Sequence, residues 1–166
     1  MSQASPMASF RRAGGAALLA AGIIVAIVAD ADRPLGISLV VTGVFVLAHL
    51  ATETAFHGRG IDYDLTADAH AGMREFAAAF TSTSGVILGL LAVFGDSEGG
   101  FSLTVKVGIG ALAADILLGI VLVGLLLAAP KTSDQDAWNF IRYVFNLALW
   151  ALALGLLCIV TPLLYE

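Results

Sequence analysis

The chain has 166 residues, of which 59% are hydrophobic and only 13% are charged, and its mean hydropathy is +0.94. A water-soluble domain carries about a quarter charged residues, so this composition excludes an ordinary soluble domain and indicates that lipid is the solvent. The net charge is −5 and the eight Lys and Arg residues are scattered, which excludes a nucleic-acid-binding surface.

Apolar runs divide the chain into candidate membrane spans. A bilayer core of roughly 30 Å takes about 20 helical residues, and about five runs reach or approach this length. Helix is expected for each run, because an open strand leaves backbone groups unsatisfied in hydrocarbon. The sequence therefore predicts an all-α fold, a polytopic transmembrane helical bundle with residues 1–166 as a single membrane domain. The predicted spans are residues 13–29, 35–55, 76–94, 107–129 and 144–164.

The first span follows an Arg-Arg pair at residues 11–12 and ends at an Ala-Asp-Ala sequence at residues 29–31. This arrangement resembles a signal peptide with its cleavage site. The apolar stretch is longer than the roughly 7–15 residues of a signal peptide core. We therefore expect a retained span, with cleavage as the alternative.

The second span carries a stripe of polar residues. His49, Glu53 and His57 are spaced by four along one helical face, and Thr52 borders them. Nitrogen and oxygen ligands on adjacent turns suit zinc or a similar divalent ion, and His70 and Glu75 could add further ligands. The alternatives are a proton or ion relay, or a helix-packing contact in which Glu53 reaches water. No cofactor is predicted, since a haem held by two histidines needs both at matched depth and only His49 is securely intramembrane.

The third helix is expected to begin near Leu65, capped by Asp64, and so to project about one or two turns beyond the bilayer. Four consecutive hydroxyl residues, 81–84, lie in its span. Exposure of all four hydroxyl groups to lipid is energetically unfavourable, although each can donate a hydrogen bond to a backbone oxygen of its own helix. We therefore predict that this run, including Thr81 and Thr83, lines a polar path.

Small residues form a stripe along the same helix, because Ala77, Thr81, Gly85 and Gly89 are spaced by four. Helices approach closely where side chains are small, and dispersion contacts then replace lipid. We expect an intrachain packing face, with a dimer seam as the alternative.

The fourth span contains a carboxyl group, Asp115, near its middle. A charged side chain there costs about 2.5–3.5 kcal/mol on insertion scales, and no Lys or Arg is predicted at matching depth. We therefore expect Asp115 to be protonated at neutral pH and to handle protons or ions. The alternative is a structural hydrogen bond that locks two helices, with Thr42 as the expected donor.

In the fifth helix, Ser133 and Asp136 predict a capping box at the start. Asn146 is expected at the inner depth of His49, so it joins the predicted polar pocket. Cys158, the single cysteine, excludes an internal disulfide and is read as a small buried hydrophobe.

Orientation follows from the basic residues, which favour the inner side of a membrane. Five spans with the N-terminus inside and the C-terminus outside place six basic residues on the inner side and two, Arg33 and Lys106, on the outer side. The aromatic residues Trp138 and Tyr143 are then expected at the inner interface and Tyr165 at the outer one. We assign the chain to a prokaryotic cell membrane as a multi-pass protein. The six inner residues are Arg11, Arg12, Arg59, Arg74, Lys131 and Arg142.

Three functions are compatible with these features. The first is a transport or channel-like protein for protons, ions or a small solute, with a path between subunits of a homo-oligomer because five short helices leave little room inside. The second is a non-catalytic subunit or assembly factor of a larger membrane complex. The third is a metal-dependent membrane enzyme, although no complete catalytic set such as Gly-x-Ser-x-Gly is present. We expect transport rather than an enzyme, and a lipid bilayer and membrane proteins as partners.

Overall fold

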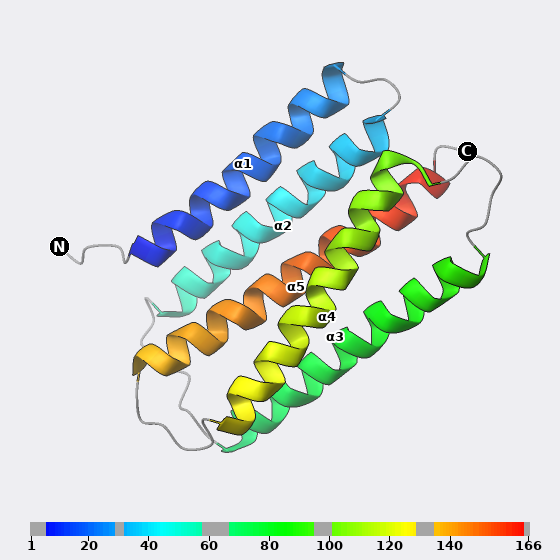
Figure 1. The fold of residues 1–166 in the computed structure, drawn as a ribbon. Coiled ribbons are helices and arrows are strands. Elements are labelled where there is room, and N and C mark those ends of the chain that lie inside the picture. Colours follow the sequence, from blue (N-terminus) through cyan, green and yellow to red (C-terminus); the bar gives the residue numbers. More distant parts are fainter. Residues whose placement is uncertain (1–5, 29–31, 58–66, 95–100, 129–134, 165–166) are drawn as a thin grey trace. The chain divides into compact units, whose positions relative to one another are not determined.

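The computed structural model describes residues 6–28, 32–57, 67–94, 101–128 and 135–164, apart from the side chains of residues 6–11, 53–57, 67–70, 94, 135 and 136. Within these residues the chain forms five α-helices (Figure 1), which confirms the all-α class. The helices are α1 (Pro6–Val28), α2 (Arg33–His57), α3 (Ala67–Phe94), α4 (Leu103–Ala128) and α5 (Gln135–Leu163).

Four of these helices are long and apolar enough to cross a membrane, which indicates a multi-pass membrane protein. α1 contributes a shorter apolar segment, Arg12–Val28. The count of five spans and the orientation therefore stay predictions. The four long apolar segments are Arg33–Thr52, Ala71–Val93, Leu103–Ala128 and Ala137–Leu163.

The helix ends extend past the predicted spans. α3 begins at Ala67, about one turn before its apolar segment, and α5 begins at Gln135, ahead of the predicted span at residues 144–164. Apolar runs stop at charged residues such as Arg74 and Arg142, whereas a helix continues through them at the membrane surface. The predicted start at Leu65 with its Asp64 cap, and the capping box at Ser133, lie outside the described part of the chain.

Hydrogen bonds and prolines account for several helix ends. Ser102 caps α4, because its Oγ accepts a hydrogen bond from the Val105 amide at 3.3 Å. Pro6 and Pro34 lie in the first turns of α1 and α2, where the missing N–H costs nothing. Pro162 removes a donor near the end of α5, which stops at Leu163.

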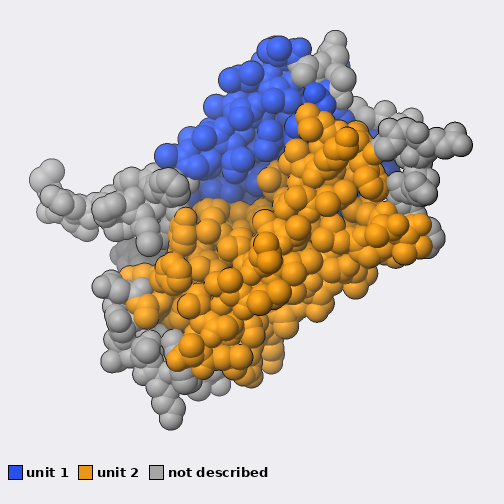
Figure 2. All heavy atoms as spheres, in the orientation of Figure 1, with its two compact units in different colours: residues 1–62, 157–166 blue, residues 63–156 orange. Residues whose placement is uncertain are grey.

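The chain divides into two compact units (Figure 2), which we describe separately. Unit 1 consists of Met1–Asp62 and Leu157–Glu166, and it contains α1, α2 and the end of α5. Unit 2 consists of Tyr63–Leu156, and it contains α3, α4 and most of α5. The single membrane domain stays a prediction.

In unit 1, α1 and α2 form an antiparallel pair with a close approach at glycines. A Cβ atom built on Gly22 would lie 2.6 Å from the Val40 amide nitrogen, and one on Gly36 would lie 2.5 Å from that of Ala26. Real Cβ atoms essentially never come within 3.0 Å of such atoms, so only glycine permits this backbone contact. Gly15 and Gly43 are spaced by seven from Gly22 and Gly36 and extend the same seam.

In unit 2, three helices meet in an apolar core. Ala77 of α3, Leu122 and Leu126 of α4, and residues of α5 pack together. Trp138 belongs to this core and is only 3% exposed, so its ring lies inside the helix contact rather than facing lipid. The α5 residues of the core are Trp138, Ile141 and Val144.

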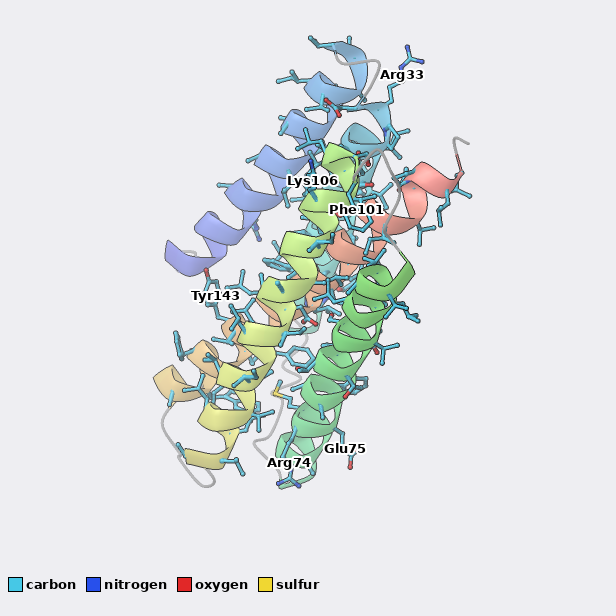
Figure 3. All side chains as sticks on the ribbon, turned by 45° about the vertical axis from the view of Figure 1, so that its right-hand side comes forward. Arg33, Arg74, Glu75, Phe101, Lys106 and Tyr143 are labelled. Atoms are coloured by element: carbon cyan, nitrogen blue, oxygen red, sulfur yellow. The ribbon has the colours of Figure 1, made fainter. Side chains whose placement is uncertain are left out.

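Large apolar side chains lie on the surface of the helices, and several polar side chains are buried between them. Ile27 of α1, Val86 of α3 and Leu117 of α4 are 75%, 62% and 66% exposed, whereas Ser84 and Asp115 are fully buried. Figure 3 shows Arg74 and Glu75 near the start of α3 and Lys106 in the first turn of α4, at opposite ends of this hairpin. An apolar flank between charged ends is what hydrocarbon solvation requires.

Candidate functional site

The candidate site is centred on Asp115, which lies in the middle of α4. It lies twelve positions after Leu103 and thirteen positions before Ala128, so it is about 18–20 Å from either end along the axis. Its side chain is fully buried. If α4 crosses the bilayer, this carboxyl group lies at the depth where an uncompensated charge is most costly.

Ser84 of α3 supplies a hydrogen-bond partner across the hairpin. Its Oγ donates to Asp115 Oδ2 at 2.6 Å, and both side chains are buried. Thr42, the expected alternative donor, belongs to unit 1, where its hydroxyl donates to the backbone oxygen of Ser38, one turn earlier on its own helix, at 2.8 Å. Its contact with Asp115 stays a prediction. A serine at the facing register of α3 satisfies one carboxyl oxygen.

The second carboxyl oxygen, Asp115 Oδ1, is buried and has no hydrogen-bond partner within the described chain. Asp115 also makes no ion pair with any residue that the structure describes. A carboxyl group that is desolvated and only half hydrogen-bonded is unfavourable in its ionised form. The arrangement therefore favours a protonated side chain with one oxygen free to exchange a proton or to bind a ligand.

Thr81 lies one turn before Ser84 on the same face of α3. Its hydroxyl oxygen is buried, and none of the described residues hydrogen-bonds to it. It lies against the backbone of Gly119 on α4, so closely that a Cβ atom on Gly119 would overlap it. Gly119 is one turn beyond Asp115 on α4. Thr81 and Ser84 of α3 therefore face Gly119 and Asp115 of α4 at two successive turns.

A second buried polar contact lies in unit 1. The Ser38 hydroxyl of α2 donates to the Pro34 backbone oxygen at 2.8 Å, and its Oγ lies 3.0 Å from the Thr161 hydroxyl at the end of α5. Thr161 donates to the Leu157 backbone oxygen at 2.6 Å. Each hydroxyl is satisfied by its own helix, so this contact is suited to helix packing.

The histidine stripe is described only in part. His49 is half-buried, and its ring lies beside that of Phe45 with centroids 6.3 Å apart. Thr52 is exposed and donates to the His49 backbone oxygen at 2.7 Å. The side chains of Glu53, His57 and His70 lie outside the described part, so the metal and relay hypotheses stay predictions. Among the side chains that are described, no three His, Cys, Asp or Glu residues gather as a metal site would require.

The other predicted site residues are placed as follows. Thr81 and Asp115 belong to one hairpin, Asn146 is buried on α5 of the same unit, and Thr83 is exposed. His49 and Thr52 belong to unit 1. A polar pocket shared by all of these residues stays a prediction.

The small-residue stripe of α3 has two parts. Ala77 is buried in the core of unit 2, and Thr81 contacts α4 at Gly119. Gly85 and Gly89 are exposed, and a Cβ atom on either would have no neighbour within 4 Å in the described structure. Intrachain packing thus accounts for the first two positions of the stripe.

Sequence reasoning did not identify Gly119 or the donor role of Ser84. The spacing Asp115-x-x-x-Gly119 was an available signal, because it places a small residue on the face of the carboxyl group.

Comparisons with protein-family models, with curated proteins and with solved structures found no match to this chain.

Proposed function

We propose that this chain is a small transport or channel-like membrane protein that carries protons or small cations, with Asp115 as the exchange group. The observation that supports this function best is the buried Asp115 carboxyl group, which has one oxygen bound to Ser84 and the other without a described partner. Intramembrane carboxyl groups are costly and mark ion or proton pathways in many membrane proteins.

The same proposal includes five spans with the N-terminus inside. α1 packs along α2 through the glycine seam, and its outer face presents Ile24, Ile27 and Val28, which are 61–78% exposed. Exposure of these side chains to water would forgo about 1.5–3 kcal/mol for each. Lipid around α1 removes that cost, which supports α1 as the fifth span.

A second candidate function is that of a non-catalytic subunit or assembly factor of a larger membrane complex. The exposed Gly85 and Gly89 of α3 favour it, since adjacent small residues allow another helix to approach closely. Purification in mild detergent separates the two candidates. Stoichiometric foreign partners support the subunit function, and a stable homo-oligomer argues against it.

Flux into liposomes tests the transport function directly. Purified protein is reconstituted, and the uptake of protons, Na⁺ and K⁺ down an imposed gradient is compared with uptake into protein-free liposomes. We expect faster flux of at least one of these ions with the protein present. Equal rates for all three would refute the transport function.

A further inference from the structure

Thr81 differs from three other hydroxyl residues that are buried in the described helices. Ser38, Thr42 and Thr161 each donate to the backbone oxygen four residues earlier, at 2.6–2.8 Å. This back-bonding is the usual way for a hydroxyl group to satisfy itself in a membrane helix. The Thr81 hydroxyl is buried but lacks such a bond and has no other described partner. Its orientation towards α4 therefore requires a different explanation.

The register of the hairpin places this hydroxyl near the free oxygen of Asp115. Ser84 faces Asp115, and Thr81, three residues earlier on α3, faces Gly119, four residues later on α4. Helical rise then separates the Thr81 hydroxyl from the Asp115 carboxyl group by about 5 Å along the axis. A direct hydrogen bond spans no more than about 3.2 Å, but one water molecule with two such bonds covers about 5 Å.

We propose that Thr81 and Asp115 Oδ1 together bind one water molecule, and that this water exchanges a proton with Asp115. Gly119 is part of the site because a larger residue would displace the Thr81 hydroxyl. This inference deepens the proposed transport function, on which it rests, by naming the proton as the cargo.

Neutralisation of Asp115 favours a proton over a metal cation. One proton on the carboxyl group removes its charge, and the resulting O–H then donates to the water. A metal cation would need several oxygen ligands, whereas this part of the hairpin offers Thr81, Ser84 and Asp115. In exchange, the O–H bond of Asp115 breaks as the water oxygen takes the proton, and the water then releases one of its protons to solvent on that side and returns to H2O. A proton that enters from the opposite side re-forms the O–H bond of the carboxylate.

Infrared spectroscopy of the reconstituted protein tests the water link. The carbonyl band of a protonated Asp115 is identified by its loss in Asp115→Asn. Thr81→Val removes the hydroxyl at nearly constant volume, so we expect the band to move to higher frequency and proton flux to slow by about two- to tenfold, the range that one hydrogen bond allows. Thr81→Ser retains the hydroxyl and should restore both values. Val86→Ala, at a 62% exposed position of the same helix, should change neither.

A second pair of variants leaves Thr81 itself unchanged. Gly119→Ala should reproduce the band shift, whereas Gly124→Ala on the same helix should not, because its Cβ meets nothing within 4 Å in the described structure. This pair also decides the question if Thr81→Val does not fold.

The outcomes separate the water link from the transport function. A band that Thr81→Val and Gly119→Ala leave unshifted overturns the link, even if wild-type flux is present. A shifted band without any flux supports the link and refutes transport. A band that disappears when Na⁺ is added, or that is absent at neutral pH, shows a cation or an ionised carboxylate and overturns the proton assignment.

Discussion

The glycine seam between α1 and α2 gives the sharpest prediction about stability. In Gly22→Ala, the new Cβ atom would lie 2.6 Å from the Val40 amide nitrogen, 2.7 Å from the Gly36 backbone oxygen and 2.9 Å from Leu39 Cβ. Two of these three atoms belong to the backbone, so no side-chain rotation can relieve the overlap. Gly14→Ala is the matched control on the same helix, because its Cβ meets nothing within 4 Å in the described structure.

The expected cost follows from the displacement. Ordinary contact begins at 3.4 Å, so Gly22→Ala forces α1 and α2 apart by about 0.8 Å, the difference between 3.4 and 2.6 Å. A gap of about 0.5–1 Å forfeits a quarter to a half of each pairwise dispersion contact. Overpacked sites typically lose about 1–3 kcal/mol. The higher helix propensity of alanine, about 0.8–1.0 kcal/mol, applies to both variants and cancels in the comparison.

Reversible unfolding in mixed micelles, followed by circular dichroism, measures this difference. We expect Gly22→Ala to be less stable than Gly14→Ala by about 1–3 kcal/mol. If the two variants have equal unfolding free energies, or Gly22→Ala is the more stable, the close backbone approach at Gly22 is not a feature of the folded protein.

Two further predictions address the core and the topology. Trp138→Ala should lower the unfolding free energy in micelles by about 3–5 kcal/mol, because it leaves a cavity in the core of unit 2. Phe140→Ala, at a 46% exposed position, should change it by about 0.5 kcal/mol or less. Similar losses for the two variants would contradict the assigned core. With Cys158 replaced by alanine, single cysteines at positions 2 and 166 should react with an impermeant maleimide from opposite sides of a sealed vesicle, and labelling from the same side would disprove an odd number of spans.

The helices could be predicted from the sequence because each apolar run is long enough to demand one. The apolar runs alone do not give the helix ends, since α3 continues through charged residues such as Arg74 beyond its apolar run, as the predicted start near Leu65 anticipated. The burial of Trp138 in the core of unit 2 could not be predicted either, and its depth at the inner interface stays a prediction. Its amphipathic ring suits either a membrane interface or a core, and only the packing of three helices decides between them.

The buried state of Asp115 followed from the cost of an exposed carboxyl group in lipid. The identity of its partner did not, because Thr42 and Ser84 both offer hydroxyl groups at comparable depth. The choice depends on which helices are neighbours and on their rotation about their axes. The spacing of residues within one helix shows neither which helices are neighbours nor how they are rotated. The contacts of Ser84 and Gly119 were therefore identified only from the α3–α4 register.

Flux and stability measured on the same preparation of Asp115→Asn test the central claim, that Asp115 is an exchange group. Asparagine keeps the shape and an oxygen that can accept from Ser84, but it carries no exchangeable acid proton. We predict that the unfolding free energy changes by about 1 kcal/mol or less, while flux falls to the rate of protein-free liposomes. Flux that persists at the wild-type rate would contradict the claim and leave the Ser84–Asp115 hydrogen bond as a packing contact.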